Sequence, residues 1–503
     1  MSERLFNWLT SRGAGVLLHP TSLPGTTGIG TLGRFAFRFV DFLADAGMKY
    51  WQVCPLGPTG FGDSPYQCFS AFAGNPYLVD LEELLEEGFL EPNDLEPLRS
   101  LPETTVDYGA QWQLRWLILQ KAFEGFRAKA MPDQQAAFAD FRQSNREWLE
   151  SYCLFMAIKS QFDSRSWQEW PPEAKRYPLA KRRFKTKELK DKASACAFYQ
   201  FKFFQQWDKL RRYAADRKIQ IFGDIPIFVA MDSADVWTHP ELFQMTEDLR
   251  PTGVAGVPPD YFAADGQLWG NPLYAWERHA KEGYAWWLAR LRASFQLYDV
   301  VRIDHFRGFD EYCRIPPDAK NARDYRWEKG AGFELFQVIQ KHFPEAKLVA
   351  EDLGVITESV RRLVNQAGLP GMKILQFAFE GATEYLPHNC VPNSVLYPGT
   401  HDNDTCWGWF NVQNPNVQDF VHRYLHTDQP DIVWQIIRAG YASASRIFIV
   451  PMQDLLNLGS EARMNTPGTP SGNWRWRFTS DQLDSLWKDR REELREYARL
   501  YER

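Results

Sequence analysis

Eight short hydrophobic runs are spread along the chain, and most of them are rich in β-branched or aromatic residues. Continuous apolar runs of this kind are typical of strands that are buried on both faces, as in a parallel sheet. We therefore predict eight strands, at residues 15–20, 50–56, 219–229, 300–306, 347–353, 372–379, 394–402 and 446–455.

Amphipathic segments separate several of the predicted strands. Residues 32–46 repeat apolar side chains at the spacing of a helix with one buried face, and they link the first two strands. Residues 333–343 and 358–367 show the same pattern before and after the fifth strand. Eight strands that alternate with helices predict an α/β fold, a (β/α)8 TIM barrel. An open doubly wound sheet is the alternative, but no GxGxxG turn follows the first predicted strand.

The predicted strands are unevenly spaced, which indicates insertions in a single catalytic unit spanning residues 1–503. Residues 57–218 separate the second and third strands and contain long helical patterns at 111–130 and 134–159. We interpret this region as a mainly helical subdomain inserted in a barrel loop. Residues 231–276 form a second, shorter insertion after the third strand. The basic stretch 180–192 includes acidic residues, which favours a solvated helix face over a site for polyanions.

Composition narrows the class of protein only a little. The net charge of −6 gives no overall attraction to nucleic acid or to anionic membranes, and no apolar run approaches the length of a membrane span. The seven cysteines are an odd number without CxxC spacing, so we expect reduced thiols in a cytoplasmic protein. Aromatic residues make up 15% of the chain, which suits a carbohydrate binder but is equally explained by a large packed core.

Acidic residues stand in or just after four of the predicted strands. They are Asp224, Asp304, Glu351 and Asp402. In a barrel of parallel strands, residues at the carboxyl ends of the strands converge on one site. Burying several carboxylates beside one another is costly without a chemical use for them. The pattern therefore points to acid–base or covalent chemistry on a sugar.

Two of these carboxylates suit the two roles of a retaining glycosyl transfer, which needs a nucleophile and an acid/base on either side of one bond. Arg302 lies two residues before Asp304, on the same face of the strand, and can keep Asp304 ionised for nucleophilic attack. Glu351 follows the apolar residues LVA, and apolar surroundings raise a carboxyl pKa, which suits a general acid/base. A purely structural ion pair is the alternative for Arg302 and Asp304.

Long irregular motifs surround these residues. RIDHFRGF (302–309), AEDLG (350–354) and GTHDNDT (399–405) together resemble conserved regions of the α-amylase superfamily. Further motifs narrow the resemblance to the 4-α-glucanotransferases called amylomaltases or disproportionating enzymes. These are HPTSLPGTTGIGTLG (19–33), PLGPTGFGDSPYQ (55–67), GDIPIFV (223–229) and GVPPDYFAADGQLWGNPLY (256–274). The resemblance covers nearly the whole chain.

The resemblance implies a 4-α-glucanotransferase that moves α-1,4-glucan segments between malto-oligosaccharides or amylose through a covalent intermediate. Asp304 matches the family's nucleophile, Glu351 its acid/base and Asp402 its transition-state stabiliser. The expected substrate-binding residues are Tyr66, Asp224, Asp260, Gln267, Trp269, Asn271, Arg302, His305 and His401. For the two histidines, ordinary core side chains are the alternative. We expect residues 254–272 to form a lid over the acceptor side, with a structural Ω-loop as the alternative.

Two departures from α-amylases bear on metal binding. The third strand reads GDIPIFV and lacks the DVVxNH pattern, whose Asn helps to hold structural calcium in those enzymes, and Thr400 stands where they carry Asn. We therefore expect no metal and no cofactor. The remaining expectations are a monomer or homodimer, with no nucleic acid and no membrane partner. A hydrolytic α-amylase and a glucan-binding scaffold without activity are the alternative functions.

Overall fold

A barrel-like sheet of eight parallel strands forms the centre of the computed structural model, which describes residues 4–60, 62–259, 265–427 and 431–503. The strand order is β10-β11-β12-β1-β2-β3-β6-β9. The two ends of this order meet, because the Ala350 N–H at the end of β9 donates to the Pro370 carbonyl next to β10 at 2.9 Å. The predicted (β/α)8 fold is confirmed, and an open doubly wound sheet is excluded. The barrel strands are β1 (Gly13–Leu17), β2 (Tyr50–Gln52), β3 (Gln220–Pro226), β6 (Val300–Asp304), β9 (Leu348–Ala350), β10 (Gly371–Ile374), β11 (Ser394–Tyr397) and β12 (Ile447–Pro451).

All eight predicted strands are present, but each prediction runs past the observed carboxyl end. The apolar residues continue into the loops because these loops are themselves buried. Val53 and Leu56, beyond β2, are 0% and 2% exposed. In two cases the apolar run continues as a short helix, α15 (Leu375–Phe379) after β10 and α19 (Met452–Leu455) after β12.

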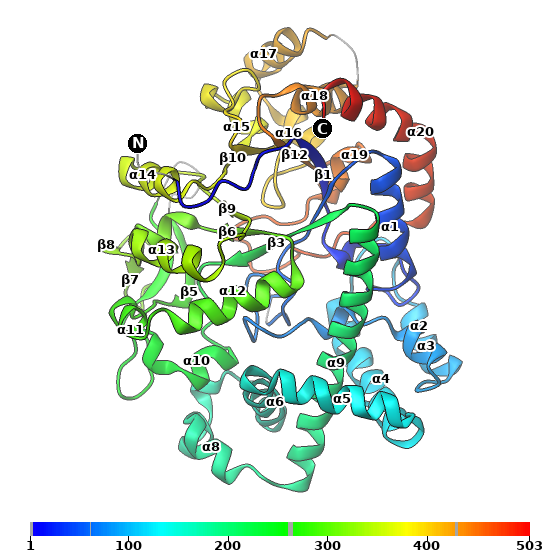
Figure 1. Ribbon diagram of the computed structural model, residues 1–503, viewed down its shortest axis with the longest axis vertical. Helices are drawn as coiled ribbons and strands as arrows, with labels where there is room; N and C mark the ends of the chain where they lie inside the picture. The colour runs from blue at the N-terminus through cyan, green and yellow to red at the C-terminus, as the bar shows by residue number, and fades with distance from the viewer. Residues whose placement is uncertain (1–3, 61, 260–264, 428–430) are drawn as a thin grey trace.

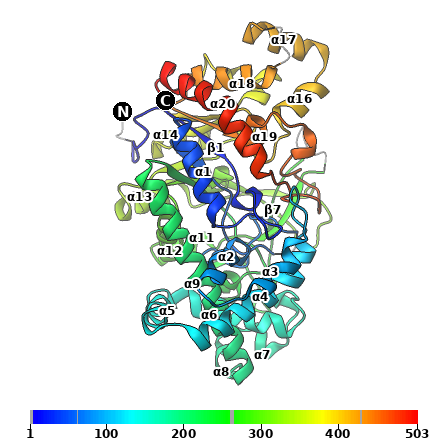
Figure 2. The same cartoon turned by 90° about the vertical axis from the view of Figure 1, so that its right-hand side faces the viewer.

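The segment between β2 and β3 is helical and gathers at one end of the molecule, as two perpendicular views show (Figures 1 and 2). Its helices are α2 (Leu81–Glu86), α3 (Pro92–Arg99), α4 (Tyr108–Lys129), α5 (Pro132–Ser144), α6 (Arg146–Gln161), α7 (Pro172–Lys175), α8 (Tyr177–Arg183) and α9 (Lys187–Asp216). The helical pattern at 134–159 is two helices and not one. Asn145 separates them, because its φ of −108° departs from the helical range, and its side chain adds a second hydrogen bond to the Phe141 carbonyl, which already accepts the Asn145 N–H.

The remaining helices follow the barrel strands along the chain. They are α1 (Arg34–Asp45), α10 (Ala234–Thr238), α11 (Trp276–Lys281), α12 (Ala285–Leu297), α13 (Gly332–His342), α14 (Glu358–Ala367), α16 (Cys406–Val412), α17 (Pro415–Leu425), α18 (Ile432–Ala442) and α20 (Ser480–Leu500). The helices predicted at 32–46, 333–343 and 358–367 correspond to α1, α13 and α14. Among the described helices, none combines the length and the apolar character needed to cross a bilayer.

A second sheet, which the sequence did not predict, has four antiparallel strands in the order β5-β4-β7-β8. They are β4 (Val254–Val257), β5 (Gln267–Pro272), β7 (Glu311–Ile315) and β8 (Arg326–Lys329). Two of the strands come from the insertion after β3, and two follow β6 after the short turn η5 (Phe306–Phe309). The small sheet therefore joins the expected lid segment to the chain that leaves Asp304.

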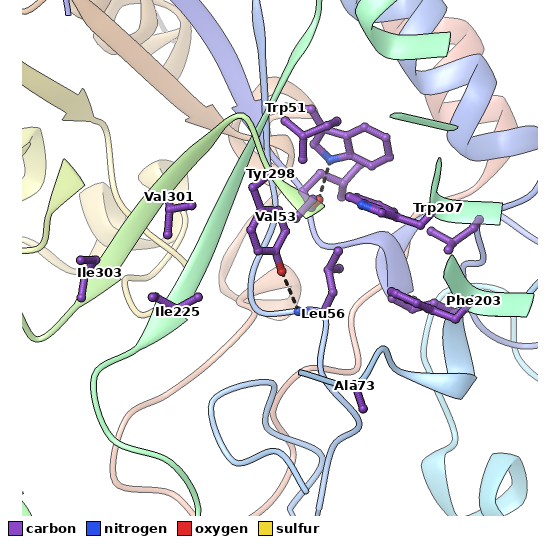
Figure 3. Packing of buried hydrophobic residues seen from close by; sticks show 14 of the residues in the cluster. Trp51, Val53, Leu56, Ala73, Phe203, Trp207, Ile225, Tyr298, Val301 and Ile303 are labelled. Atoms are coloured by element: carbon purple, nitrogen blue, oxygen red, sulfur yellow. Dashed lines mark hydrogen bonds between the residues drawn. The ribbon is translucent and has the colours of Figure 1, made fainter. Parts of the chain in front are cut away.

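The loop after β2 is fixed to the barrel and to α9 by buried contacts (Figure 3). The Leu56 N–H donates to the Tyr298 hydroxyl at 3.3 Å, and the Trp51 indole N–H donates to the Leu18 carbonyl at 2.8 Å. Gly74 lies against the ring of Phe203 so closely that an added Cβ would lie 2.0 Å from a ring carbon. This loop carries Tyr66, so these contacts set the position of one wall of the site described next.

Candidate active site

The four acidic residues lie on one face of the barrel. Asp304 is the last residue of β6, Glu351 directly follows β9, Asp224 lies within β3, and Asp402 lies in the loop between β11 and α16. Because the strands are parallel, their carboxyl ends meet at this face. A cleft of about 310 Å³ opens there, and Asp304 and Asp402 both line it.

Arg302 holds two of the carboxylates. Its guanidinium donates to Asp224 Oδ2 at 2.5 Å and to Asp304 Oδ1 at 2.7 Å, and only 4% of its side chain is exposed. The Tyr66 hydroxyl donates to the same Asp224 oxygen at 2.9 Å. Burial raises the pKa of Asp224 to about 6, although the charge of Arg302 acts in the opposite direction. The guanidinium thus gives Asp304 a fixed orientation and a positive neighbour.

Glu351 is held by the backbone. Its Oε2 accepts the N–H of His305 and its Oε1 accepts the N–H of Leu353, both at 2.8 Å. His305 has a φ of 51°, a left-handed conformation that directs its N–H toward Glu351. Burial, and then the negative charge of Asp304, raise the pKa of Glu351 to about 8. The site therefore pairs an arginine-bound carboxylate with a carboxyl group that is protonated at neutral pH.

Residues 463–474, a segment that sequence analysis did not identify, contact Asp402. We call this segment the Asn465 wall. Asn465 Nδ2 donates to Asp402 Oδ1 at 2.6 Å, and Arg463 Nη2 donates to the Asp402 carbonyl at 2.7 Å. Trp474 packs against His401 with ring centroids 5.7 Å apart. No periodic pattern marks these residues, and their partners lie more than sixty positions away. The irregular run of Gly, Pro and Asn there was the one available signal.

Tyr66 and His401 form a stacked pair of rings in the cleft wall, with centroids 5.1 Å apart and planes inclined by 22°. His401 Nε2 also lies 3.5 Å from Asp402 Oδ2. The predicted residues Tyr66, His401 and Asp402 therefore come from two distant parts of the chain and meet in one surface.

A further wall of the cleft is formed by the hairpin of β4 and β5. Gln267, Trp269 and Asn271 alternate along β5, so their side chains point to the same face, and all three line the cleft. The edge of the Trp269 ring meets His305 at a centroid distance of 4.8 Å. Asn271 donates to the Val229 carbonyl at 2.8 Å, which fixes the hairpin to the loop after β3. Asp260, the remaining predicted residue of this segment, lies outside the described residues.

The predicted residues do not all face the cleft. Tyr66, Gln267, Trp269, Asn271, Asp304, His305, His401 and Asp402 line it. Asp224 lines a separate cavity of about 50 Å³ together with Arg290 and Tyr298. Within the described chain, Arg302 and Glu351 reach the cleft through their contacts with Asp304 and His305 and do not belong to its lining.

Comparison with known proteins gives one consistent result. A family model described as 4-alpha-glucanotransferase matches residues 18–483. The 4-alpha-glucanotransferase of Thermus thermophilus is 50% identical over 483 residues, which cover 94% of this chain and 96% of the relative. That of Synechocystis sp. is 46% identical over 483 residues, covering 95% of each chain.

Solved structures agree with the sequence comparison. The amylomaltase of Streptococcus agalactiae in complex with acarbose matches with a TM-score of 0.93 and 40% identity, covering 98% of this chain and 99% of that chain. The amylomaltase of Corynebacterium glutamicum matches with a TM-score of 0.75 at 18% identity, covering 97% of this chain and 75% of that one, which supports the fold alone.

Proposed function

We propose, from the premise that this chain belongs to the 4-alpha-glucanotransferase family, that it transfers α-1,4-glucan segments between malto-oligosaccharides with retention of configuration. One observation carries the assignment of roles. Asp304 is bound to Arg302, while the neighbouring Glu351 has its pKa raised to about 8. Two carboxyl groups in such different environments suit a nucleophile and an acid/base.

In the first step, a carboxylate oxygen of Asp304 attacks the anomeric carbon of the donor sugar. The glycosidic bond breaks, and Glu351 gives its proton to the leaving oxygen, so the released chain carries a free 4-hydroxyl. Arg302 donates to Oδ1 of Asp304 and keeps the carboxylate oriented. The product of this step is an ester between the glucan segment and Asp304.

In the second step, Glu351 is ionised and acts as a base. It takes the proton from the 4-hydroxyl of an acceptor glucan, whose oxygen attacks the anomeric carbon and releases Asp304. Both transition states carry positive charge at the anomeric carbon. We assign their stabilisation to Asp402, whose carboxylate faces the cleft and would accept hydrogen bonds from the sugar's 2- and 3-hydroxyls.

Transfer instead of hydrolysis requires that an acceptor sugar displaces water from the second step. The hairpin wall supplies an aromatic face, Trp269, between two amide side chains, Gln267 and Asn271, next to His305. Aromatic faces stack on the C–H faces of sugars, and amides bind hydroxyls. We propose that this wall, with Asp260, binds the acceptor, and that Tyr66 and His401 bind the donor sugar.

The cellular location and the oligomeric state of the enzyme are also proposals. We infer a cytoplasmic enzyme, supported by seven cysteines that all have free thiols. The catalytic steps above use only side chains of this chain. A monomer or homodimer remains the expected state.

Incubation with maltotriose tests the proposed reaction. Glucose together with oligosaccharides longer than maltotriose is the expected result. Products that are all shorter than maltotriose would instead indicate a hydrolytic α-amylase. An unchanged substrate would contradict both readings and favour a glucan-binding scaffold.

The variant D304N tests the nucleophile. We expect turnover to fall by about 10⁴-fold or more, with little change in the unfolding temperature. D318N serves as the matched control, because Asp318 is exposed and lies away from the cleft. Activity retained in D304N would refute the assigned role of Asp304.

A further inference from the structure

Asp402 stands in a loop beyond β11, whereas Asp304 ends a barrel strand. Its side chain is 46% exposed and borders the cleft. A carboxylate in such a place turns freely unless a neighbour holds it. The role proposed for Asp402 requires a fixed direction toward two adjacent sugar hydroxyls.

Asn465 provides that restraint. Its Nδ2 lies 2.6 Å from Asp402 Oδ1. A carboxylate is only an acceptor, so the nitrogen of the amide must be the atom that faces it. The bond uses one lone pair of Oδ1 and leaves Oδ2 and the rest of Oδ1 for other donors. The side-chain torsion of Asp402 is thereby restrained by a neighbour that lines the same cleft.

The backbones of the two residues are also tied together. Arg463 donates from Nη2 to the Asp402 carbonyl at 2.7 Å and from Nε to the Asn465 carbonyl at 2.9 Å. The Asn465 N–H donates to the His401 carbonyl at 3.1 Å. One guanidinium therefore bridges the two segments and helps to hold the Asn465 amide within hydrogen-bond distance of the Asp402 carboxylate.

The far end of the Asn465 wall is anchored as firmly. The Trp474 N–H donates to the Met464 carbonyl at 2.8 Å, and the Trp474 carbonyl accepts the Tyr108 hydroxyl at 3.0 Å. Trp474 is 3% exposed and has a φ of 63°, which is uncommon for a bulky residue. Such strain persists only where the surrounding structure enforces it.

We infer that Asn465 is a positioning residue that orients the Asp402 carboxylate for the transition state, and that Arg463 fixes the separation of the two residues. The inference rests on the proposed function, since it assigns Asn465 a task only if Asp402 stabilises the reacting sugar. A displacement of about 1 Å at a reacting centre costs on the order of 100-fold in rate.

Two substitutions at position 465 distinguish a role in orienting Asp402 from a role in supporting the loop. N465A removes the donor at every pH, and we expect kcat to fall by about 10–100-fold with a smaller change in KM. N465D places a carboxyl group where the amide stood. When that group is protonated it donates the missing hydrogen bond, and when it ionises it repels Asp402.

The measured quantity is the ratio of kcat for N465D to kcat for N465A between about pH 5 and about pH 8. His401, Arg463, Asp304 and Glu351 are present in both variants, so a trend in the ratio reports the group introduced at position 465 and its interaction with these neighbours. We expect the ratio to rise steadily as the pH falls. N473A is the matched control, because its amide lies in the same wall but bonds Thr466 and Thr469, and its ratio to the parent should not follow this trend.

A ratio that is flat or falls on acidification, or a loss in N465A confined to KM, would overturn the inference. Circular dichroism at each pH shows whether the variants stay folded. The parent protein with maltotriose is measured first. Absence of transfer by the parent would refute the proposed function, whereas transfer by the parent with a flat ratio would refute only the role of Asn465.

Discussion

At the scale of single residues, the surroundings of Glu351 shift its pKa in both directions. Burial and the charge of Asp304 raise its pKa to about 8, while Arg302 and the amides of Leu353 and His305 pull it down. Both amide bonds favour the ionised form, which is the form that the proposed second step needs. In the proposed mechanism, the same contacts therefore stabilise Glu351 after it has given up its proton.

The raised pKa of Glu351 predicts an alkaline limb in the pH profile. Protonated Glu351 is present below about pH 8 and is lost above it, so kcat/KM for maltotriose should fall as the pH rises through about 8. An α-maltosyl fluoride donor needs no proton on its leaving group and serves as the control, because its first step should lack the limb. A profile for maltotriose that stays level to about pH 10 would contradict the role of Glu351.

At the scale of elements, α9 holds the loop that carries Tyr66. Gln200 exchanges two hydrogen bonds with the backbone of Gly74, at 2.7 and 2.8 Å, and Gln206 does the same with Asp80, at 2.7 and 3.1 Å. Both glutamines are buried. Each side-chain amide therefore replaces a strand partner that the loop backbone lacks.

Removing one of these amides should destabilise the fold. In Q200A the N–H and carbonyl of Gly74 are left buried without partners, so we expect the free energy of unfolding to fall by roughly 2–3 kcal/mol. Q205A is the control on the same helix: Gln205 is exposed and accepts one hydrogen bond from Lys202, which keeps its ion pair with Glu87, so the free energy of unfolding should fall less. Urea denaturation measures both variants. Equal stability of Q200A and Q205A would show that these bonds do not hold the loop.

The elements also show what sequence patterns can predict. The barrel strands were recognisable because strands buried on both faces are continuously apolar. The strands of the small sheet were not, since β8 reads RWEK and is partly exposed, and its sheet joins segments more than forty residues apart. The end of α5 was missed because Asn145, the non-helical residue between α5 and α6, does not break the apolar pattern.

At the scale of the whole molecule, one buried residue that supports the fold lies at the end of the barrel opposite the acidic site. The acidic residues cluster at the carboxyl ends of the strands. At the amino ends, the buried guanidinium of Arg503 donates to the carbonyl of Gly13, the first residue of β1, and to that of Arg446, which precedes β12. It also donates to the carbonyls of Gly440, Tyr441, Ser443 and Ser445. One side chain therefore joins α18 to two barrel strands.

This separation predicts a variant that loses stability and keeps its chemistry. R503A leaves several buried carbonyls without a donor, and we expect the free energy of unfolding to drop by roughly 2–3 kcal/mol while kcat is unchanged below the unfolding temperature. R499A removes an exposed arginine of α20 and should leave the unfolding temperature where it is. A large loss of kcat in folded R503A would contradict the division between the two ends.

The candidate site was predictable only in part, for a physical reason. The residues proposed to contact the sugars lie in long motifs, so Asp304 and Trp269 could be proposed from the sequence. Asn465 and Arg463 contact Asp402 through hydrogen bonds to a distant loop, and such bonds leave no periodic pattern in the chain. The position of Asp224 also depends on packing that no sequence pattern predicts. Asp224 accepts a hydrogen bond from Tyr66 and lines a cavity separate from the cleft.

The most direct test of the account is to trap the covalent intermediate. E351Q should still react with α-maltosyl fluoride, because fluoride leaves without a proton, but it lacks the base that completes transfer. Intact-mass and peptide analysis should then find a maltosyl ester on Asp304. No ester in E351Q while the parent turns over the same donor, or an ester on Asp402 or any other residue, would contradict the mechanism proposed for this enzyme.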